Sequence, residues 1–170
     1  LPKSIVLTIA HSGLTSIIGP SGTGKSTLIR CINRLVAPPS GRILLNLAGA
    51  QVDMAQLRGA ALRHARRHIG MVFQEPMTAL NPVHTIGHQV AEPLRMHRGM
   101  KGSEARKEAI ALLDRVGIPS AAQRFDAYPH QFSGGQRQRI TIAMALACRP
   151  DLLIADEPTT ALDVMLQVQI

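Results

Sequence analysis

Short apolar runs alternate with longer segments that repeat apolar side chains at helical spacing. The apolar runs predict strands at residues 5–9, 14–18, 42–47, 69–73 and 152–155. The helical spacing predicts helices at residues 26–35, 54–67, 85–97, 103–116 and 133–148, with a further helix from Asp163 onward. Strands and helices alternate at both ends, and a helical block interrupts the middle. This order predicts an α/β fold with a parallel-sheet core, an antiparallel β element and a helical insertion.

Composition and charge narrow the class of protein. Apolar residues make up 45% of the 170 residues and charged residues 18%, which argues against disorder and is enough for one packed domain. No stretch reaches the roughly 20 apolar residues that a membrane helix requires. The net charge of +8 leaves three explanations open: solvated helix faces, a membrane-proximal surface, or contact with nucleic acid. With one Tyr, three Phe and no Trp, a base-stacking platform for single strands is disfavoured.

A glycine-rich segment follows the second predicted strand and leads into a predicted helix. It fits the phosphate-binding pattern G-x-x-x-x-G-K-[ST] and reads Gly19-Pro20-Ser21-Gly22-Thr23-Gly24-Lys25-Ser26-Thr27. The glycines allow backbone N–H groups to point at phosphates, and the helix N-terminus adds a positive dipole. Lys25 is the candidate to reach the β- and γ-phosphates, and the Ser26 hydroxyl is the candidate ligand of Mg²⁺. The motif predicts a P-loop NTPase with a RecA-like core.

Two acids follow the last apolar run. Asp156 is expected to emerge at the carboxyl end of a buried strand, where ligands gather in parallel sheets. Its carboxylate can hold Mg²⁺ through water, while Glu157 is free to polarise an attacking water. The two acids therefore predict hydrolysis of the bound nucleotide.

A second phosphate-binding element lies between these motifs. Ser133-Gly134-Gly135-Gln136 opens a predicted helix and offers a hydroxyl, backbone N–H groups and a positive dipole. With this signature the sequence closely resembles ATP-binding cassette (ABC) ATPases over residues 4–170. The resemblance implies that the signature of one subunit closes over the γ-phosphate of ATP held by another subunit. It also implies that Gln74 contacts Mg²⁺ and the attacking water and senses a membrane partner, and that residues 161–163 cross between subunits.

The resemblance implies the ATP-hydrolysing subunit of an importer, at the cytoplasmic face of the bacterial inner membrane. Its implied partners are a second ABC ATPase subunit, a transmembrane permease and, indirectly, an extracytoplasmic solute-binding protein, with no nucleic acid. Residues 75–132 are expected to form a helical subdomain that docks the permease, and residues 1–74 and 133–170 the nucleotide-binding core. Segments similar to the dipeptide, oligopeptide, nickel and glutathione importer branch are 73–82, 91–94, 128–131 and 156–163. Segments similar to phosphonate importer ATPases are 17–22, 30–35, 57–59 and 69–73.

Two features of the family are missing from this sequence. Residues 1–18 contain no aromatic side chain to stack on adenine, and no histidine stands in the place of the family's switch histidine. These departures predict a truncated ABC ATPase fold, a fragment of a longer protein with weak nucleotide binding and negligible turnover. One alternative is a soluble ABC-type ATPase that acts on nucleic acid, although no sustained heptads separate Lys25 from Ser133. A second alternative is a catalytically inactive fragment.

Overall fold

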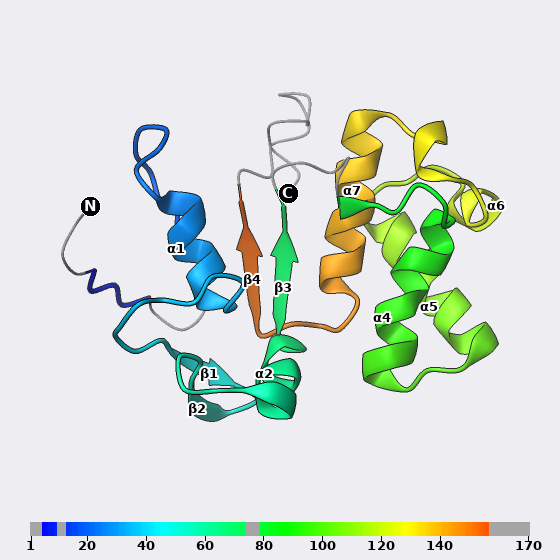
Figure 1. Ribbon diagram of the computed structural model, residues 1–170. Helices are drawn as coiled ribbons and strands as arrows, with labels where there is room; N and C mark the ends of the chain where they lie inside the picture. The colour runs from blue at the N-terminus through cyan, green and yellow to red at the C-terminus, as the bar shows by residue number, and fades with distance from the viewer. Residues whose placement is uncertain (1–4, 10–12, 74–78, 157–170) are drawn as a thin grey trace.

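Two parallel strands run through the middle of the molecule (Figure 1). The computed structural model describes residues 5–9, 13–73 and 79–156. Strand β3 (Ile69–Val72) pairs with β4 (Leu152–Ala155) in a register that sets Val72 opposite Ala155. The predicted strand at 152–155 is confirmed in both bounds, and the one at 69–73 ends a residue earlier. Parallel strands require a long crossover, and the helical block between them supplies it.

An antiparallel hairpin forms the predicted second β element. Strand β1 (Leu44–Leu47) pairs with β2 (Ala50–Asp53), and Leu47 lies opposite Ala50. The two turn residues, Ala48 and Gly49, both have positive φ angles, of 49° and 79°, which matches the twist of a two-residue hairpin. The apolar pattern predicts the first strand at 42–47 but not β2, because Ala50–Asp53 has too little apolar alternation to stand out.

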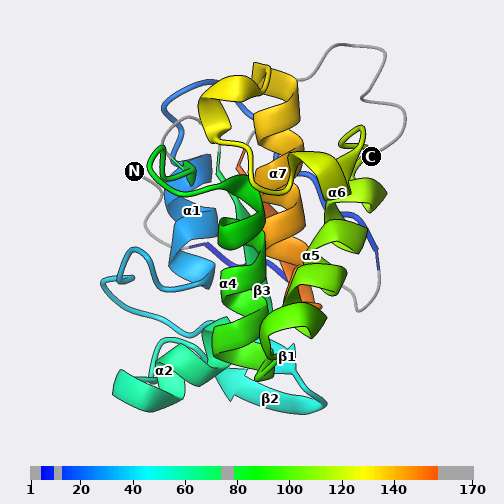
Figure 2. The same cartoon turned by 90° about the vertical axis from the view of Figure 1, so that its right-hand side faces the viewer.

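The largest hydrophobic core lies within the helical block. It is formed by α4 (Ile86–Arg98), α5 (Gly102–Arg115), α6 (Ala121–Arg124) and α7 (Gly134–Leu146), with the short 3₁₀ helix η1 (Pro129–Gln131) before α7. Its most buried large side chains, none more than 2% exposed, are Ile86, Val90, Leu94, Leu113, Ile118 and Ile140. Figure 2 shows α4, α5 and α7 side by side, with the hairpin and α2 below them in this view. The three long helices are confirmed to within two residues at each end, whereas α6 and η1 were not predicted.

Helix α7 packs against the helical block and also against β3. The contact with β3 is close because Gly70 carries no side chain. A Cβ at this position would stand 2.7 Å from the backbone carbonyl oxygen of Ala145. The absence of a side chain at Gly70 thus allows α7, and with it the helical block, to lie this close to β3.

Two shorter helices flank the strands. Helix α1 (Lys25–Ile32) has no buried residue, and the Arg66 guanidinium holds its C-terminal end by donating to the carbonyls of Asn33 and Arg34. Helix α2 (Gly59–Arg66) begins five residues later than the prediction of 54–67. The reason is local: an Asp53 carboxylate oxygen accepts hydrogen bonds from the N–H groups of Ile43 and Ala55, which holds a turn where the helix was expected.

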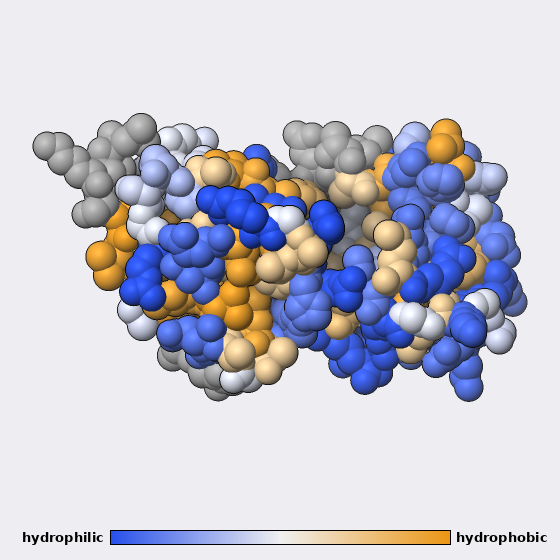
Figure 3. All heavy atoms as spheres, turned by 60° about the horizontal axis from the view of Figure 1, so that its bottom comes forward, coloured by the Kyte–Doolittle hydropathy of each residue, from blue (hydrophilic) through white to orange (hydrophobic). Residues whose placement is uncertain are grey.

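The predicted strands at 5–9 and 14–18 are wrong. Both segments lack regular secondary structure, and their side chains are largely exposed, with Val6 at 94%, Leu14 at 96% and Ile18 at 92%. Apolar composition does not make a strand by itself, because each strand needs a hydrogen-bonded neighbour, and in the described part of the chain these segments have none. In Figure 3 hydrophobic colour gathers on the half that carries these segments, while the helical half is mostly hydrophilic.

Candidate phosphate and metal site

The glycine-rich loop adopts a conformation that its glycines permit. Gly22 and Gly24 have φ angles of 79° and 91°, in the left-handed region. A Cβ at either position would meet no atom within 4 Å, so glycine is needed there for backbone conformation rather than for space. Gly24 is the N-cap of α1, and the Thr23 hydroxyl closes the loop by donating to the Pro20 carbonyl at 2.9 Å. The loop therefore ends at a helix N-terminus, which favours a bound anion.

Lys25 lies across this loop. Its Nζ donates to the carbonyl oxygens of Gly19 at 2.8 Å and Pro20 at 2.9 Å. An ammonium group has three donors, so two of them hold the side chain against the loop and one remains for a further acceptor. The positive charge of Lys25 is thus fixed beside the N-terminus of α1.

The structure brings Ser26 and Asp156 together although 130 positions separate them. The Ser26 hydroxyl donates to Asp156 Oδ1 at 2.8 Å. Asp156 follows β4 directly and is only 2% exposed, and its backbone N–H continues the parallel ladder by donating to the Val72 carbonyl at 2.9 Å. The acid therefore emerges at the carboxyl end of β4, as the sequence predicts. The predicted burial of that strand is wrong, because only Ile154 is buried and Leu153 is 46% exposed.

This pair suits a magnesium ion. Hydroxyl and carboxylate oxygens are the hard ligands that Mg²⁺ prefers, and Mg²⁺ commonly takes one or two carboxylates while waters and phosphate oxygens fill its other positions. Among the described residues, no group of three or more His, Cys, Asp or Glu side chains could hold a metal ion. One hydroxyl and one carboxylate fill only part of a magnesium coordination shell, so this pair fits a metal shared between the protein and a phosphate.

Arg30 also belongs to this site, although no sequence motif predicts it. One of its guanidinium nitrogens donates to Asp156 Oδ2 at 3.0 Å, so Ser26 and Arg30 bind the two oxygens of one carboxylate. The spacing of Ser26 and Arg30 could have indicated this contact, because residues four apart lie on the same face of a helix. A basic residue four positions after Ser26 predicts a cation near whatever Ser26 contacts.

The signature segment lies at the N-terminus of α7 and caps that helix. The Ser133 hydroxyl accepts a hydrogen bond from the Gln136 N–H at 3.3 Å, and the Gln136 side chain accepts one from the Ser133 N–H at 3.2 Å. In Figure 1 the two strands lie between α1 and α7, so the structure does not bring the signature and the phosphate loop of this chain into one site. Gln74 and Glu157 lie outside the described residues.

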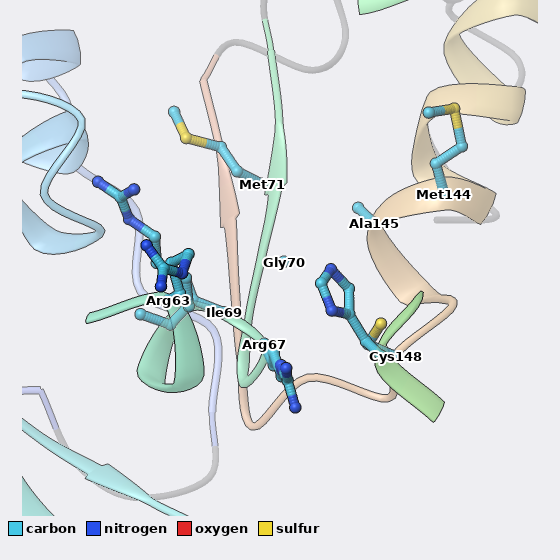
Figure 4. Close-up of a pocket in the computed structure, with 10 residues that line it drawn as sticks. Arg63, Arg67, Ile69, Gly70, Met71, Met144, Ala145 and Cys148 are labelled. Atoms are coloured by element: carbon cyan, nitrogen blue, oxygen red, sulfur yellow. The ribbon is translucent and has the colours of Figure 1, made fainter. Parts of the chain in front are cut away.

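A separate cavity of about 200 Å³ lies toward the start of β3 (Figure 4). Residues from α2, β3, α4 and α7 line it, and Arg67 and Cys148 are among them. Burial raises the pKa of the Cys148 thiol, which disfavours its thiolate. None of the predicted site residues lines this cavity, so the cavity is distinct from the phosphate and metal site.

In the part of the chain that the structure describes, no helix combines the length and the hydrophobicity needed to span a lipid bilayer.

Known proteins resemble this chain over most of its length. A family profile described as "ABC transporter" matches residues 2–160. A Brucella melitensis protein named "Putative peptide import ATP-binding protein" is 56% identical over 162 residues, which are 91% of this chain and 48% of that protein. A Brucella abortus protein with the same descriptive name is 51% identical over 164 residues, which are 96% of this chain and 49% of that protein. The chain therefore spans about half the length of the curated relatives it matches.

Two solved structures have a fold similar to that of this chain. One is a dimeric ATP-binding cassette in a post-hydrolysis state bound to ADP and Pi, with 36% identity, a TM-score of 0.83, and coverage of 96% of this chain and 68% of that chain. Another is a dimeric bacterial ABC transporter cassette, with 36% identity, a TM-score of 0.77, and coverage of 89% and 63%. The predicted α/β fold with its helical insertion is confirmed by these likenesses.

Proposed function

Because this chain belongs to the ABC transporter family, we propose that it binds and hydrolyses ATP to power an importer of peptides or a similar small solute. The observation that carries the proposal is the 2.8 Å hydrogen bond between Ser26 and Asp156, next to Lys25 and the N-terminus of α1. The start of α1 thus supplies a cation and a hydroxyl, and the end of β4, 130 positions away from Ser26, supplies the carboxylate. The names of the Brucella relatives support a peptide as the transported solute.

Each residue of the site has a role in this proposal. The loop from Gly19 to Thr27 wraps the phosphates, and Lys25 uses its remaining donor on their oxygens. Ser26 and Asp156 would hold Mg²⁺, which when bound supplies positive charge against the phosphates. Glu157 would polarise the attacking water, and Gln74 would contact that water and the metal, as the resemblance to the family implies.

The proposal includes a second subunit. The signature, Ser133 to Gln136, would bind the γ-phosphate of ATP held by that subunit, because it offers a hydroxyl and a helix N-terminus across the strands from this chain's own loop. The dimeric state of the two similar cassettes supports this arrangement.

The rest of the proposal concerns the membrane. Residues 75–132 would form a helical subdomain that docks a permease, and residues 1–74 and 133–170 the nucleotide-binding core. The protein would lie peripherally at the cytoplasmic face of the inner membrane and receive its solute from an extracytoplasmic binding protein through the permease. Co-purification of the protein with a polytopic membrane protein tests this part, and a stable complex without any permease would contradict it.

Nucleotide binding tests the core of the proposal. Binding of a fluorescent ATP analogue is measured with Mg²⁺ on the protein expressed from its complete reading frame. Lys25→Ala removes a charge-assisted contact worth about 1.5–3 kcal/mol, so we expect binding roughly 10- to 100-fold weaker. Lys107→Ala is the matched control, because Lys107 is an exposed lysine on α5 far along the chain from the loop.

Two results bear on the proposal directly. If Lys25→Ala and Lys107→Ala bind the analogue equally well, the loop is not a phosphate site and the proposal fails.

Hydrolysis is tested by Glu157→Gln, which should bind ATP as the wild type does but turn it over at least about 100-fold more slowly. Unchanged turnover would remove Glu157 from its role and leave the binding result in place.

A further inference from the structure

We propose that Arg30 is a positioning residue that orients the Asp156 carboxylate for the magnesium–nucleotide complex. The inference rests on the proposed function and adds to it a residue outside the phosphate-binding motif. It concerns the one ion pair in the described residues that involves an expected metal ligand.

Two side chains of one helix each donate to a different oxygen of the Asp156 carboxylate. Ser26 and Arg30 are four residues apart, so they lie on the same face of α1, one turn from each other. Ser26 holds Oδ1 at 2.8 Å, at the turn next to the phosphate loop, and Arg30 holds Oδ2 at 3.0 Å, one turn further from it. With both oxygens held, the carboxylate cannot rotate about its last bond, and Oδ1 stays on the side of the loop.

Burial explains why the cation is needed. The Asp156 side chain is 3% exposed, whereas that of Arg30 is 41% exposed and reaches the acid from the surface. A buried carboxylate is costly unless charge or hydrogen bonds compensate for it, and the Ser26 hydroxyl alone compensates for one oxygen. Arg30 is the only cation paired with Asp156 in the residues that the structure describes.

The position of helix α1 depends on polar contacts, and those of Arg30 and Arg66 can be tested separately. The helix has no buried residue, so few apolar contacts fix its position relative to β4. Its polar anchors include the Asp156 contacts of Ser26, in its first turn, and of Arg30, one turn later. Its C-terminal end is held by the Arg66 contacts and by hydrogen bonds from the Asn33 and Arg34 side chains to Met71 and Ala55. Arg66 holds the helix without touching Asp156, and it therefore provides a control that separates anchoring from positioning.

The expected consequence is a specific loss of metal affinity. Residues that orient metal ligands typically change metal affinity about 10- to 100-fold when they are removed. Arg30→Met keeps most of the aliphatic stem and removes the donors, so we expect the Mg²⁺ concentration for half-maximal enhancement of nucleotide binding to rise about 10-fold or more. Binding of the same nucleotide in EDTA should change less than about twofold, because the phosphates rest on the loop and Lys25 rather than on Arg30.

The experiment titrates Mg²⁺ against binding of a fluorescent ATP analogue, with an EDTA series beside it. It uses the protein expressed from its complete reading frame as wild type, Arg30→Met, Arg30→Lys and Arg66→Met. Arg30→Lys keeps the charge with a single donor group and should recover part of the Mg²⁺ affinity. Arg66→Met should match the wild type in both series. Thermal unfolding of each variant identifies any that fails to fold, and Arg30→Lys then carries the test.

Each outcome decides between the alternatives. A loss confined to the Mg²⁺ series in the Arg30 variants, with Arg66→Met unaffected, supports the positioning role. Equal losses in EDTA and in Mg²⁺, or equal losses in Arg30→Met and Arg66→Met, show that Arg30 only anchors α1 and overturn the inference alone. Tighter Mg²⁺ binding in Arg30→Met also overturns it, because Arg30 would then compete with the metal. If the wild type binds no nucleotide in either series, the proposed function fails and the inference fails with it.

Discussion

The contact between β3 and α7 offers a sharp test of how the helical block is held to the sheet. Gly70→Ala would place a methyl carbon 2.7 Å from the Ala145 carbonyl oxygen and 3.0 Å from side-chain atoms of Leu153 and Pro150. The first contact is about 0.7 Å shorter than the 3.4 Å at which ordinary contact begins. The obstacle is helix backbone, which cannot turn aside as a side chain can, so α7 must shift or β3 must distort.

Overpacking of this kind costs about 1–3 kcal/mol. We expect about 2 kcal/mol for Gly70→Ala, because one clash is with backbone and two others are with side chains. For a chain of this size that loss corresponds to a fall in Tm of roughly 4–8 °C. Circular dichroism during heating measures the shift, and a urea titration gives the change in the free energy of unfolding.

The control is a glycine without such a neighbour. Gly134 has an ordinary φ, and a Cβ there would meet nothing within 4 Å. Gly134→Ala should therefore leave the free energy of unfolding within about 0.5 kcal/mol of the wild type. If Gly70→Ala is as stable as Gly134→Ala, α7 does not lie close enough to β3 to exclude a methyl group at position 70, and the reasoning is refuted.

Three further changes test other parts of the fold. The Arg98 guanidinium, by hydrogen bonding, holds the pKa of Glu108 below its usual 4.5, so Glu108→Gln should cost about 1 kcal/mol of stability at pH 7. Because the folded pKa is the lower one, that cost should be constant above about pH 5, start to fall below pH 4.5 and be lost as the pH falls through the lower, folded pKa, as denaturation curves at several pH values would show. Ser133→Ala removes the cap of α7 and should lower the free energy of unfolding by about 1 kcal/mol in urea titrations. Gly87→Ala drives a methyl group into the Phe125 ring and should cost about 1–3 kcal/mol by thermal unfolding.

Each of these predictions has a matched control. Glu92→Gln changes an exposed acid on α4 and should show no such pH-dependent loss; an equal loss would mean that the Glu108 ion pair contributes nothing. Ser133→Thr keeps a capping hydroxyl, so a loss as large as that of Ser133→Ala would point away from capping. Adding Phe125→Leu to Gly87→Ala should recover part of the stability, and purely additive losses would argue against the clash.

Several features of the site follow from local sequence. The loop from Gly19 to Thr27 was predicted because its glycines and the helix after it are adjacent in the chain, and Gly22 and Gly24 adopt the left-handed conformation that glycine permits. Ser133 was expected to open a helix, and its hydroxyl caps α7. The position of Asp156 at the end of β4 also follows from an apolar run that ends in an acid. In each case the interacting groups lie within a few residues of one another.

Pairing between distant segments limited the rest of the prediction. Residues 5–9 and 14–18 have the composition of strands but lack paired neighbours in the described residues, while β2 exists because β1 lies beside it. Strand formation depends on a partner whose position the segment itself does not encode. The start of α2 was missed for a related reason, because the Asp53 carboxylate binds Ile43 from the far side of the hairpin.

The sequence by itself determined the kinds of chemical group this protein carries: a phosphate loop with Lys25 and Ser26, and an acid at a strand end. Only the tertiary structure decided that Ser26 and Arg30 bind the two oxygens of Asp156, across 130 and 126 positions of chain. Local motifs are readable because backbone conformation and capping depend on neighbouring residues. The orientation of a buried carboxylate depends on which face of α1 packs beside β4, and packing of distant elements sets that face.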